Sequence, residues 1–499
     1  MEPMQFTYEN FWWMSEDDSF WQKNQVLFSE WLDLTSNMYS INLAQKPKPF
    51  LTLTGEPIGG FVVDVWQYYF PVFCTRDEKM YKWTQQVYTG IKVRSFWTTS
   101  KYLYMIDDTE DIHRILLSDT NLLDWSNKVI KTDTNLVSDV SKVHHIITRE
   151  AFTYIAYWTN IYRINNDTGT MANYYEFCPA TITGFEYLGS AIRITLKNWM
   201  VLIWDMISDS PDSDGTELGI KVNHIKQLGW TSLALSGESI YLIWKFEPHP
   251  VFNQYYSDVL QAKKVAIARN IWPYTITENR GLLYIAGRSK ETYDVWGDEF
   301  WKNWVMTFWS KKANTSPYLN IENVVNNAEK SYSQIYGVVS AGLDEANLEE
   351  KVYIMYKDED WNYWVDYLEI SDWNYRTVKK WLLILNSFDG WDKVKWKNLS
   401  TITINADFWD TGGKIEVFKV EKGIFTPVCQ QHSSEAEKLA NSTISFESVD
   451  NWEISARKDY HIFPKDDFEN ITLAFKISQP VNELKSNSIK IYSITLKYS

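Results

Sequence analysis

The chain has 499 residues, and tryptophan, with 26 residues, outnumbers glycine, with 20. Its formal charge of −15 disfavours a general nucleic-acid binder, which needs a basic surface, and a polybasic protein of the membrane surface. Hydrophobic residues make up 45% and charged residues 23%, so the chain can bury a large core and is not disordered as a whole.

The first residues, Met1–Tyr8, contain neither a basic region nor an apolar core, and no stretch is long and apolar enough for a transmembrane helix. We therefore expect no signal peptide and no membrane span, and a protein that is made in the cytoplasm and stays there or leaves inside an assembly. The three cysteines, Cys74, Cys178 and Cys429, are too few and too widely spaced for a disulfide framework or a zinc site. They should be reduced, buried thiols.

Residues 1–55 form a polar, turn-rich segment. The sequence Lys-Pro-Lys-Pro from Lys46 indicates extended backbone, because the residue before a proline disfavours the helical region. The segment has too little hydrophobic patterning to fold alone. We expect an extended N-terminal arm that gains order on a partner.

Residues 56–396 consist of short apolar runs separated by turn signals, as in all-β proteins. Seven such runs are 68–73, 101–106, 152–157, 191–197, 239–245, 281–287 and 351–357. Anchor residues in successive runs are 36, 50, 40, 47, 43 and 69 residues apart, and propeller blades repeat at roughly 40–50 residues. We assign the long last gap to an extra hairpin and an insertion at 313–333. The pattern predicts a β-propeller of about seven blades; a stack of β-sandwich domains is the alternative.

Residues 397–499 alternate apolar and polar side chains over six or seven longer runs, which is typical of a β-sandwich. The runs are 399–408, 414–420, 442–448, 453–463, 471–478 and 488–498. The last run ends the chain as a strand that should be part of a sheet. We therefore expect a C-terminal β-sandwich over residues 397–499.

Many tryptophans occupy places where turns normally have glycine. Asn198-Trp199 lies between two apolar runs, where Asn-Gly would be the strongest short hairpin signal because a type I′ turn needs positive φ. Asp360-Trp361-Asn362 repeats the pattern at a turn that favours Asp-Gly. Tryptophan has a Cβ atom and is strained at positive φ.

We hypothesise that most of these tryptophans are UGA codons that the source organism reads as glycine. The suspected turn positions are Trp12, Trp13, Trp97, Trp125, Trp158, Trp199, Trp296, Trp361, Trp364, Trp373 and Trp391. The two residue types together make up 46 of 499 residues, an ordinary glycine level for a turn-rich β protein. Trp204 and Trp244 lie inside apolar runs and could be genuine. The alternative is a tryptophan-rich protein with exposed aromatic platforms.

With glycine at these positions, the chain resembles large virion proteins of tailed phages. Residues 10–34 then read NFGGMSEDDSFGQKNQVLFSEGLDL, which looks like the FGG element before an arm and a propeller. Residues 301–319 become similar to a G-(V/I)-Y-x-(F/Y/W)-G-(R/S)-K segment of that family, carried by Val305, Thr307, Phe308, Trp309, Ser310 and Lys311. Residues 364–370 and 380–406 resemble the strand that closes the propeller and enters a sandwich. The resemblance implies a structural role at the neck or tail and no catalytic residues.

The sequence offers little enzymatic chemistry. Asp209, Asp212 and Asp214 precede Gly215 in an acidic loop that could hold a calcium ion, but the downstream glutamate of such a loop is missing, which favours a solvated loop. The seven histidines lack the spacing of a zinc protease, and no P-loop, GxSxG or GxGxxG motif occurs. We expect no enzyme, no cofactor and no metal.

These observations predict a non-enzymatic virion structural protein of a tailed phage. It should bind other virion proteins, in a homo-oligomeric ring or in multiple copies, with no membrane and no sequence-specific nucleic acid as partner. The alternative is a glycan-binding adhesin or receptor-binding protein that uses exposed aromatic side chains.

Overall fold

The computed structural model describes a defined part of the chain, and every structural statement below concerns that part. The described residues are 4–9, 13–14, 25–30, 32–33, 42–43, 47–65, 68–99, 101–109, 111–116, 144–175, 178–205, 211, 215–228, 231–236, 239–244, 247–252, 256–257, 262–263, 266–267, 276–279, 282–288, 293–300, 304–309, 320–325, 330, 332–342, 350–369, 380–385, 388, 396–407, 413–446, 457–478 and 490–499.

The fold is all-β, as the sequence predicts, with one short helix, α1 (Glu435–Asn441), in the described part of the chain. Six small antiparallel sheets have three or four strands each. The first three are β7 (Pro57–Val65), β8 (Tyr68–Thr75), β9 (Lys79–Lys82) and β10 (Gln85–Tyr88); β11 (Val93–Thr98), β12 (Tyr102–Asp107) and β13 (Ile112–Leu116); and β14 (Ile146–Arg149), β15 (Phe152–Tyr157), β16 (Asn160–Asn165) and β17 (Met171–Tyr175). The next two are β18 (Ile182–Leu188), β19 (Ala191–Leu196), β20 (Met200–Trp204) and β21 (Thr216–Glu217); and β22 (His224–Leu228), β23 (Thr231–Ser236), β24 (Ser239–Trp244) and β25 (Glu247–Phe252).

The sixth small sheet joins distant parts of the chain. It contains β35 (Gln334–Gly342), β36 (Glu350–Lys357), β37 (Tyr363–Glu369) and, beside β37, the N-terminal strand β6 (Lys48–Leu53). A strand from before the first sheet thus completes the last one. Three further pairs are two-stranded: β4 (Leu32–Asp33) with β5 (Asn42–Leu43), β26 (Tyr256–Ser257) with β27 (Ala262–Lys263), and β31 (Tyr293–Asp294) with β32 (Glu299–Phe300).

A larger sheet of twelve strands runs from the ring of small sheets into the C-terminal part. Its first members are β28 (Ala266–Ile267), β29 (Ile276–Asn279), β30 (Leu282–Arg288), β33 (Trp304–Trp309) and β34 (Asn320–Val325). It continues through β2 (Trp13–Met14) and β3 (Gln25–Glu30) to β38 (Lys380–Leu385), β45 (Leu473–Ser478), β40 (Gly413–Glu421), β41 (Ile424–Pro427) and β42 (Thr443–Phe446).

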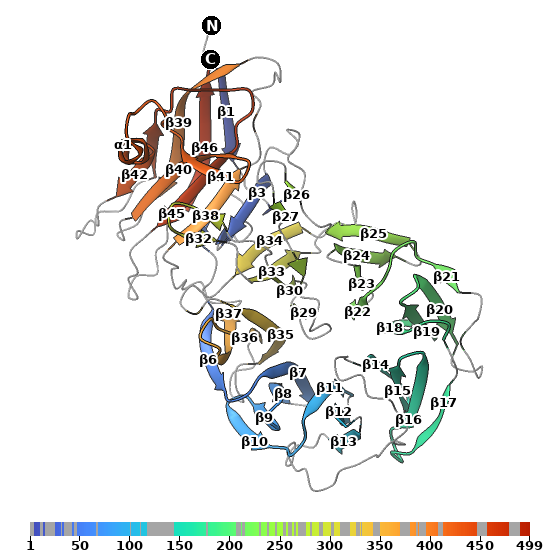
Figure 1. Ribbon diagram of the computed structural model, residues 1–499. Helices are drawn as coiled ribbons and strands as arrows, with labels where there is room; N and C mark the ends of the chain where they lie inside the picture. The colour runs from blue at the N-terminus through green and yellow to red at the C-terminus, as the bar shows by residue number, and fades with distance from the viewer. Residues whose placement is uncertain are drawn as a thin grey trace.

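The small sheets and the β28–β34 group follow one another around a ring (Figure 1). Hydrophobic clusters join each group to the next: one contains Phe61 of β7 and Phe96 of β11, and another contains Val201 of β20 and Ile225 of β22. A further cluster joins Phe73 of the first sheet to residues of the last sheet such as Met355. Apolar packing therefore also connects the last sheet to the first, and the first strands of the small sheets face the middle of the ring in Figure 1.

The seven apolar runs found in the sequence between residues 68 and 357 all correspond to observed strands. They are β8, β12, β15, β19, β24, β30 and β36; β8, β12, β15, β19 and β36 are the second strand of their sheets, and β24 is the third. Such a strand is easy to recognise in the sequence when its side chains are buried between neighbouring sheets. In β12, for example, all six residues are buried. A strand that is covered on both faces appears as a continuous apolar run.

The C-terminal strands form two layers, which together we call the sandwich. One layer consists of β1 (Met4–Glu9), β46 (Lys490–Tyr498), β39 (Lys397–Asp407), β43 (Lys458–Ile462) and β44 (Asp466–Phe468); the other is the β38–β45–β40 end of the twelve-stranded sheet. One large hydrophobic cluster lies between them and includes Ile404, Phe475 and Leu496.

Two predicted boundaries are wrong. Residues 1–55 are not an arm outside the folded parts, because β1 pairs with β46 over six residues and β6 pairs with β37. The boundary at residue 396 also fails, because β38, predicted in the propeller, pairs with β45. Both errors have one cause: a sequence pattern reports which residues are extended and apolar but not which distant strand satisfies their backbone hydrogen bonds.

Candidate functional site

Five tryptophans have left-handed backbone, and all five lie in turns. Their φ angles are 48° at Trp83, 56° at Trp158, 74° at Trp199, 52° at Trp296 and 68° at Trp361. Positive φ is uncommon in residues other than glycine because the Cβ atom crowds the backbone. Each of these residues therefore stands in a conformation that glycine adopts without strain.

Tryptophan is overrepresented among the strained positions. In the described part of the chain nine residues other than glycine have positive φ, and five of them are tryptophan. The remaining four are Glu78, Glu150, Lys422 and Lys465. Asparagine, aspartate and histidine are the residues normally enriched there, so a majority of tryptophan is unexpected for ordinary turns.

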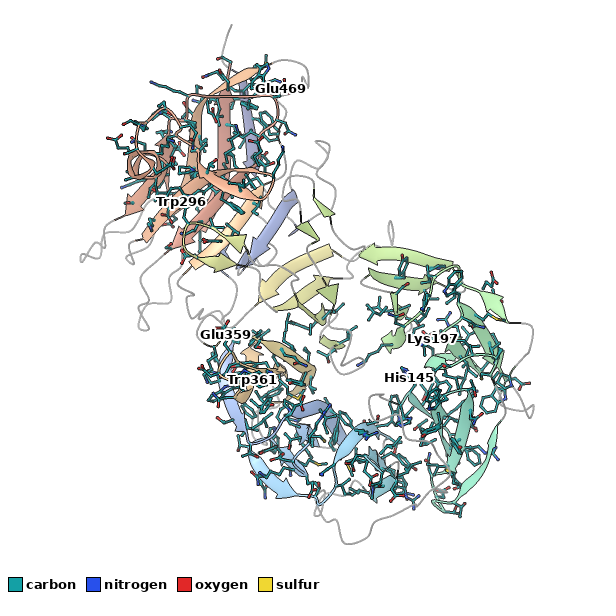
Figure 2. The ribbon with its side chains drawn as sticks, in the orientation of Figure 1. His145, Lys197, Trp296, Glu359, Trp361 and Glu469 are labelled. Atoms are coloured by element: carbon teal, nitrogen blue, oxygen red, sulfur yellow. The ribbon has the colours of Figure 1, made fainter. Side chains whose placement is uncertain are left out.

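Three of the five occupy the same connection in different sheets, the hairpin between the second and third strands. Trp158 lies between β15 and β16, Trp199 between β19 and β20, and Trp361 between β36 and β37. In the sequence, the same connection between β23 and β24 contains Gly237. The exposed fractions of the three side chains are 45%, 51% and 72%, and Figure 2 shows Trp361 at the edge of its sheet. The sequence predicted turns at all three positions.

Trp83 is a turn residue that sequence reasoning missed. It follows β9 and, with Thr84, forms the two-residue connection to β10. The sequence signal was a tryptophan between two short runs that lacks an adjacent asparagine, aspartate or glycine. Its indole nitrogen donates to the carbonyl oxygen of Gly342 at 3.3 Å, so the side chain also contacts the neighbouring sheet.

A carboxylate organises the turn after β12. Oδ1 of Asp107 accepts from the backbone N–H of Asp111 at 2.9 Å, and Oδ2 lies 2.7 Å from Nε2 of His113. Burial would raise the pKa of Asp107, but hydrogen bonds from His113, Thr109 and Asp111 outweigh it and hold the pKa below its usual value. The pair is therefore a structural clamp across the hairpin.

The turn after β36 repeats this arrangement residue for residue. Oδ1 of Asp358 accepts from the backbone N–H of Asn362 at 2.8 Å, and Oδ2 accepts from the indole N–H of Trp364 at 2.7 Å. Burial again opposes the charge of Asp358, and the hydrogen bonds from Trp364 and Asn362 lower its pKa overall. Trp364 occupies the place that His113 has in the other turn.

Three of the suspected turn positions lie in strands instead, which corrects the sequence prediction. Trp13 is in β2, Trp97 in β11 and Trp364 in β37, and none of the three has positive φ. The indole of Trp97 donates to Oγ1 of Thr148 at 2.9 Å, across to the next sheet. The prediction failed because a tryptophan next to an apolar run can also be part of the strand, as the half-buried Trp97 and Trp364 are.

Several predicted positions lie outside the described residues: Trp12, Trp125, Trp373, Trp391 and the acidic candidates Asp209, Asp212 and Asp214. In the described part of the chain, no group of three His, Cys, Asp or Glu residues could hold a metal ion. Nor does that part contain a helix with the length and apolar character needed to cross a membrane.

Buried polar groups in the ring serve packing. Nε of Arg193, in β19, lies 2.6 Å from Oε2 of Glu186, in β18, and both side chains are almost fully buried.

Cys74, Cys178 and Cys429 are free and buried, as predicted, and burial raises the pKa of Cys178 to about 11. A thiol with a raised pKa is a poor nucleophile, so Cys178 is suited to packing.

No protein-family model and no curated protein matches the sequence. Among solved structures, the computationally designed Ika8 protein is similar with 8% identity and a TM-score of 0.37, over 64% of this chain and 100% of that chain. A chain in the Mitotic Checkpoint Complex is similar with 10% identity and a TM-score of 0.39, over 65% of this chain and 92% of that chain. Likenesses at this level do not bear on function.

Proposed function

We propose that the ring of sheets is a β-propeller of about seven blades and that the chain is a non-enzymatic structural protein of a tailed-phage virion, at the neck or tail. The supporting observation is the interlocked architecture. The N-terminal segment contributes β6 to the last sheet of the ring and β1 to the sandwich. Such a body is held together at several points, as a building block of a particle requires.

The proposed propeller rests on the order of packing. Consecutive sheets share hydrophobic clusters, and Phe73 and Tyr81 of the first sheet share one with Tyr353 and Met355 of the last. A four-stranded sheet cannot cover both of its faces alone, whereas a closed ring of sheets covers them all and shortens the exposed edges. With the β28–β34 group included, the ring accounts for seven blades.

The proposed origin rests on the tryptophan turns. Glycine at residues 83, 158, 199, 296 and 361 would remove five strained positions at once. A reading of UGA as glycine occurs in some uncultured bacterial lineages and in their phages, which links the turns to the proposed virion. Trp204 is fully buried against Tyr154, with ring centroids 5.3 Å apart, and we propose that this tryptophan is genuine.

The partners would be other virion proteins, including further copies of this chain in a ring or in multiple copies. The formal charge of −15 would keep the free protein soluble before assembly and would repel the genome along any DNA path. Gold-labelled antibody against the chain should mark the neck or tail of purified particles. Absence of the protein from particles, or retention of duplex DNA by the purified protein at physiological salt, would contradict the proposal.

A glycan-binding role is the second candidate, and the exposed turn residues favour it. Trp361 is 72% exposed, and the ammonium of Lys357 lies 3.7 Å from its ring centroid. Exposed indole rings stack on sugar faces. Binding on a glycan array that is lost when Trp158, Trp199 and Trp361 are replaced by glycine would support this role and count against the structural one.

A further inference from the structure

A hairpin inserted in the β28–β34 group of the ring reaches the sandwich. The hairpin Tyr293–Phe300 consists of β31, β32 and the turn between them, and it lies in the sequence between β30 and β33. Figure 1 shows β32 next to the sandwich strands β38 and β45. Val295 in its turn is completely buried and belongs to the hydrophobic cluster of the sandwich. The hairpin is therefore inserted in the sequence of the ring, but it packs against the sandwich.

A buried lysine holds this hairpin. The ammonium of Lys476, in β45, donates to the carbonyl oxygens of Val295 at 3.0 Å and Trp296 at 3.4 Å. It also lies 2.6 Å from Oδ2 of Asp298 in the same turn and 3.3 Å from Oε2 of Glu416 in β40. Only 4% of the Lys476 side chain is exposed.

Contacts of the Trp296 side chain support the same attachment. Phe418 of β40 is fully buried, and the ring of Trp296 lies 6.2 Å from it, centroid to centroid. The indole N–H of Trp296 donates to the carbonyl oxygen of Phe425 at 3.1 Å, and Figure 2 shows Trp296 at the base of the sandwich. The contacts of Lys476 are with backbone oxygens and Asp298, so they do not depend on whether residue 296 is tryptophan or glycine.

Another connection between the ring and the sandwich consists of few paired residues in the described part of the chain. Along the twelve-stranded sheet, β34 and β2 pair at a single position, Met14 with Ile321, and β2 pairs with β3 at two positions. A sheet this narrow can twist and open locally at low cost, because few backbone hydrogen bonds hold it. The hairpin therefore adds ionic and hydrogen-bond contacts to the connection between the ring and the sandwich.

We propose that Lys476 is a latch that fixes the C-terminal sandwich to the ring through the hairpin Tyr293–Phe300. With the latch closed, ring and sandwich form one rigid body. Opening the latch removes the attachment through the hairpin and lets the sandwich change its orientation. This inference concerns the chain itself and does not depend on the proposed virion role.

The test is limited chymotrypsin digestion of the full chain and of the variant Lys476→Met. Methionine keeps much of the apolar stem but leaves Asp298 and two carbonyl oxygens without their donor, so the hairpin opens more often. We expect cleavage within Tyr293–Phe300 to become at least about tenfold faster, while cleavage after Tyr187, an exposed residue of the ring, keeps its rate. The matched control is Lys414→Met, because Lys414 is 2.8 Å from Glu416 and belongs to the sandwich alone.

Equal hairpin cleavage in the Lys476→Met and Lys414→Met variants would overturn the proposal. Where Lys476→Met does not fold, Asp298→Asn serves instead, because it weakens the contact with the hairpin and leaves the pair of Lys476 and Glu416 within the sandwich. Faster cleavage of the hairpin in Asp298→Asn, with an unchanged rate at Tyr187, supports the latch. An unchanged rate at the hairpin overturns it.

Discussion

At the scale of single residues, backbone conformation divides the tryptophans into two kinds. Trp199 and Trp361 are exposed and have positive φ, so the side chain adds strain at a turn. Trp204 and Trp364 lie in strands, the first buried in a core and the second bonded to Asp358. Sequence context separated Trp204 from the turn residues but not Trp364, because the bond to Asp358 exists only once the hairpin has formed.

The first kind should gain stability on replacement by glycine. Trp361→Gly and Trp199→Gly remove a Cβ atom from left-handed backbone and should each raise the free energy of unfolding by about 1 kcal/mol. Urea unfolding of the single variants measures this. The control is Phe463→Gly, because Phe463 is 55% exposed but does not have positive φ, and it should bring no gain. A loss of stability in both turn variants would contradict the account.

The second kind should lose stability. Trp364→Phe keeps an aromatic ring but removes the N–H that donates to Asp358, which should lower the free energy of unfolding by about 1–2 kcal/mol. Trp364→His restores a ring N–H, as His113 provides for Asp107, and should recover part of the loss. If the phenylalanine and histidine variants unfold at the same urea concentration as the original chain, the hydrogen bond has no structural role.

A lysine in the ring predicts a pH effect. Nζ of Lys226 donates to the carbonyl oxygen of Ile276 at 2.8 Å, and burial lowers the pKa of Lys226 to about 8. The unfolded chain therefore holds this proton up to a higher pH than the folded chain, so stability rises as the pH increases from about 8 towards the ordinary lysine pKa of about 10.4. Lys226→Met should lack this contribution. Parallel stability curves for the two chains across that range would contradict it.

At the scale of elements, strands within the ring were predictable and their closing partners were not. The run 152–157 coincides with β15, because a continuous apolar run and its flanking turns are local properties. The positions of β1 and β6 depend on partners several hundred residues away, β46 and β37. Nothing local in a six-residue strand distinguishes a free arm from a strand that completes a distant sheet.

The pairing of β1 makes the sandwich depend on the first residues of the chain. Phe6 is buried, and its ring stacks on Phe388 with centroids 4.7 Å apart. Phe6→Ala should therefore cost about 3–4 kcal/mol of the stability of the sandwich, measured by thermal unfolding. Gln5→Ala, on the exposed face of the same strand, should have little effect. Equal melting temperatures for the two variants would show that β1 is not part of the fold.

At the scale of the whole molecule, the sequence predicted an all-β chain and the order of its parts. The repeat spacing located one strand of each group in the ring, because a strand such as β12, with all six residues buried, forms a continuous apolar run. The crossing of the twelve-stranded sheet from ring to sandwich and the inserted hairpin at Val295 had no periodic signal. The proposed virion role and the proposed glycine turns belong together, because both point to a phage genome with a reassigned codon.

Mass spectrometry of peptides from purified particles tests this central claim most directly. Peptides that cover residues 191–206 and 357–375 include the turns at Trp199 and Trp361, which have φ angles of 74° and 68°. The account predicts that the particles contain this protein and that both positions have the mass of glycine, while Trp204 and Trp364 have the mass of tryptophan. Tryptophan at positions 199 and 361 in the native protein would contradict it.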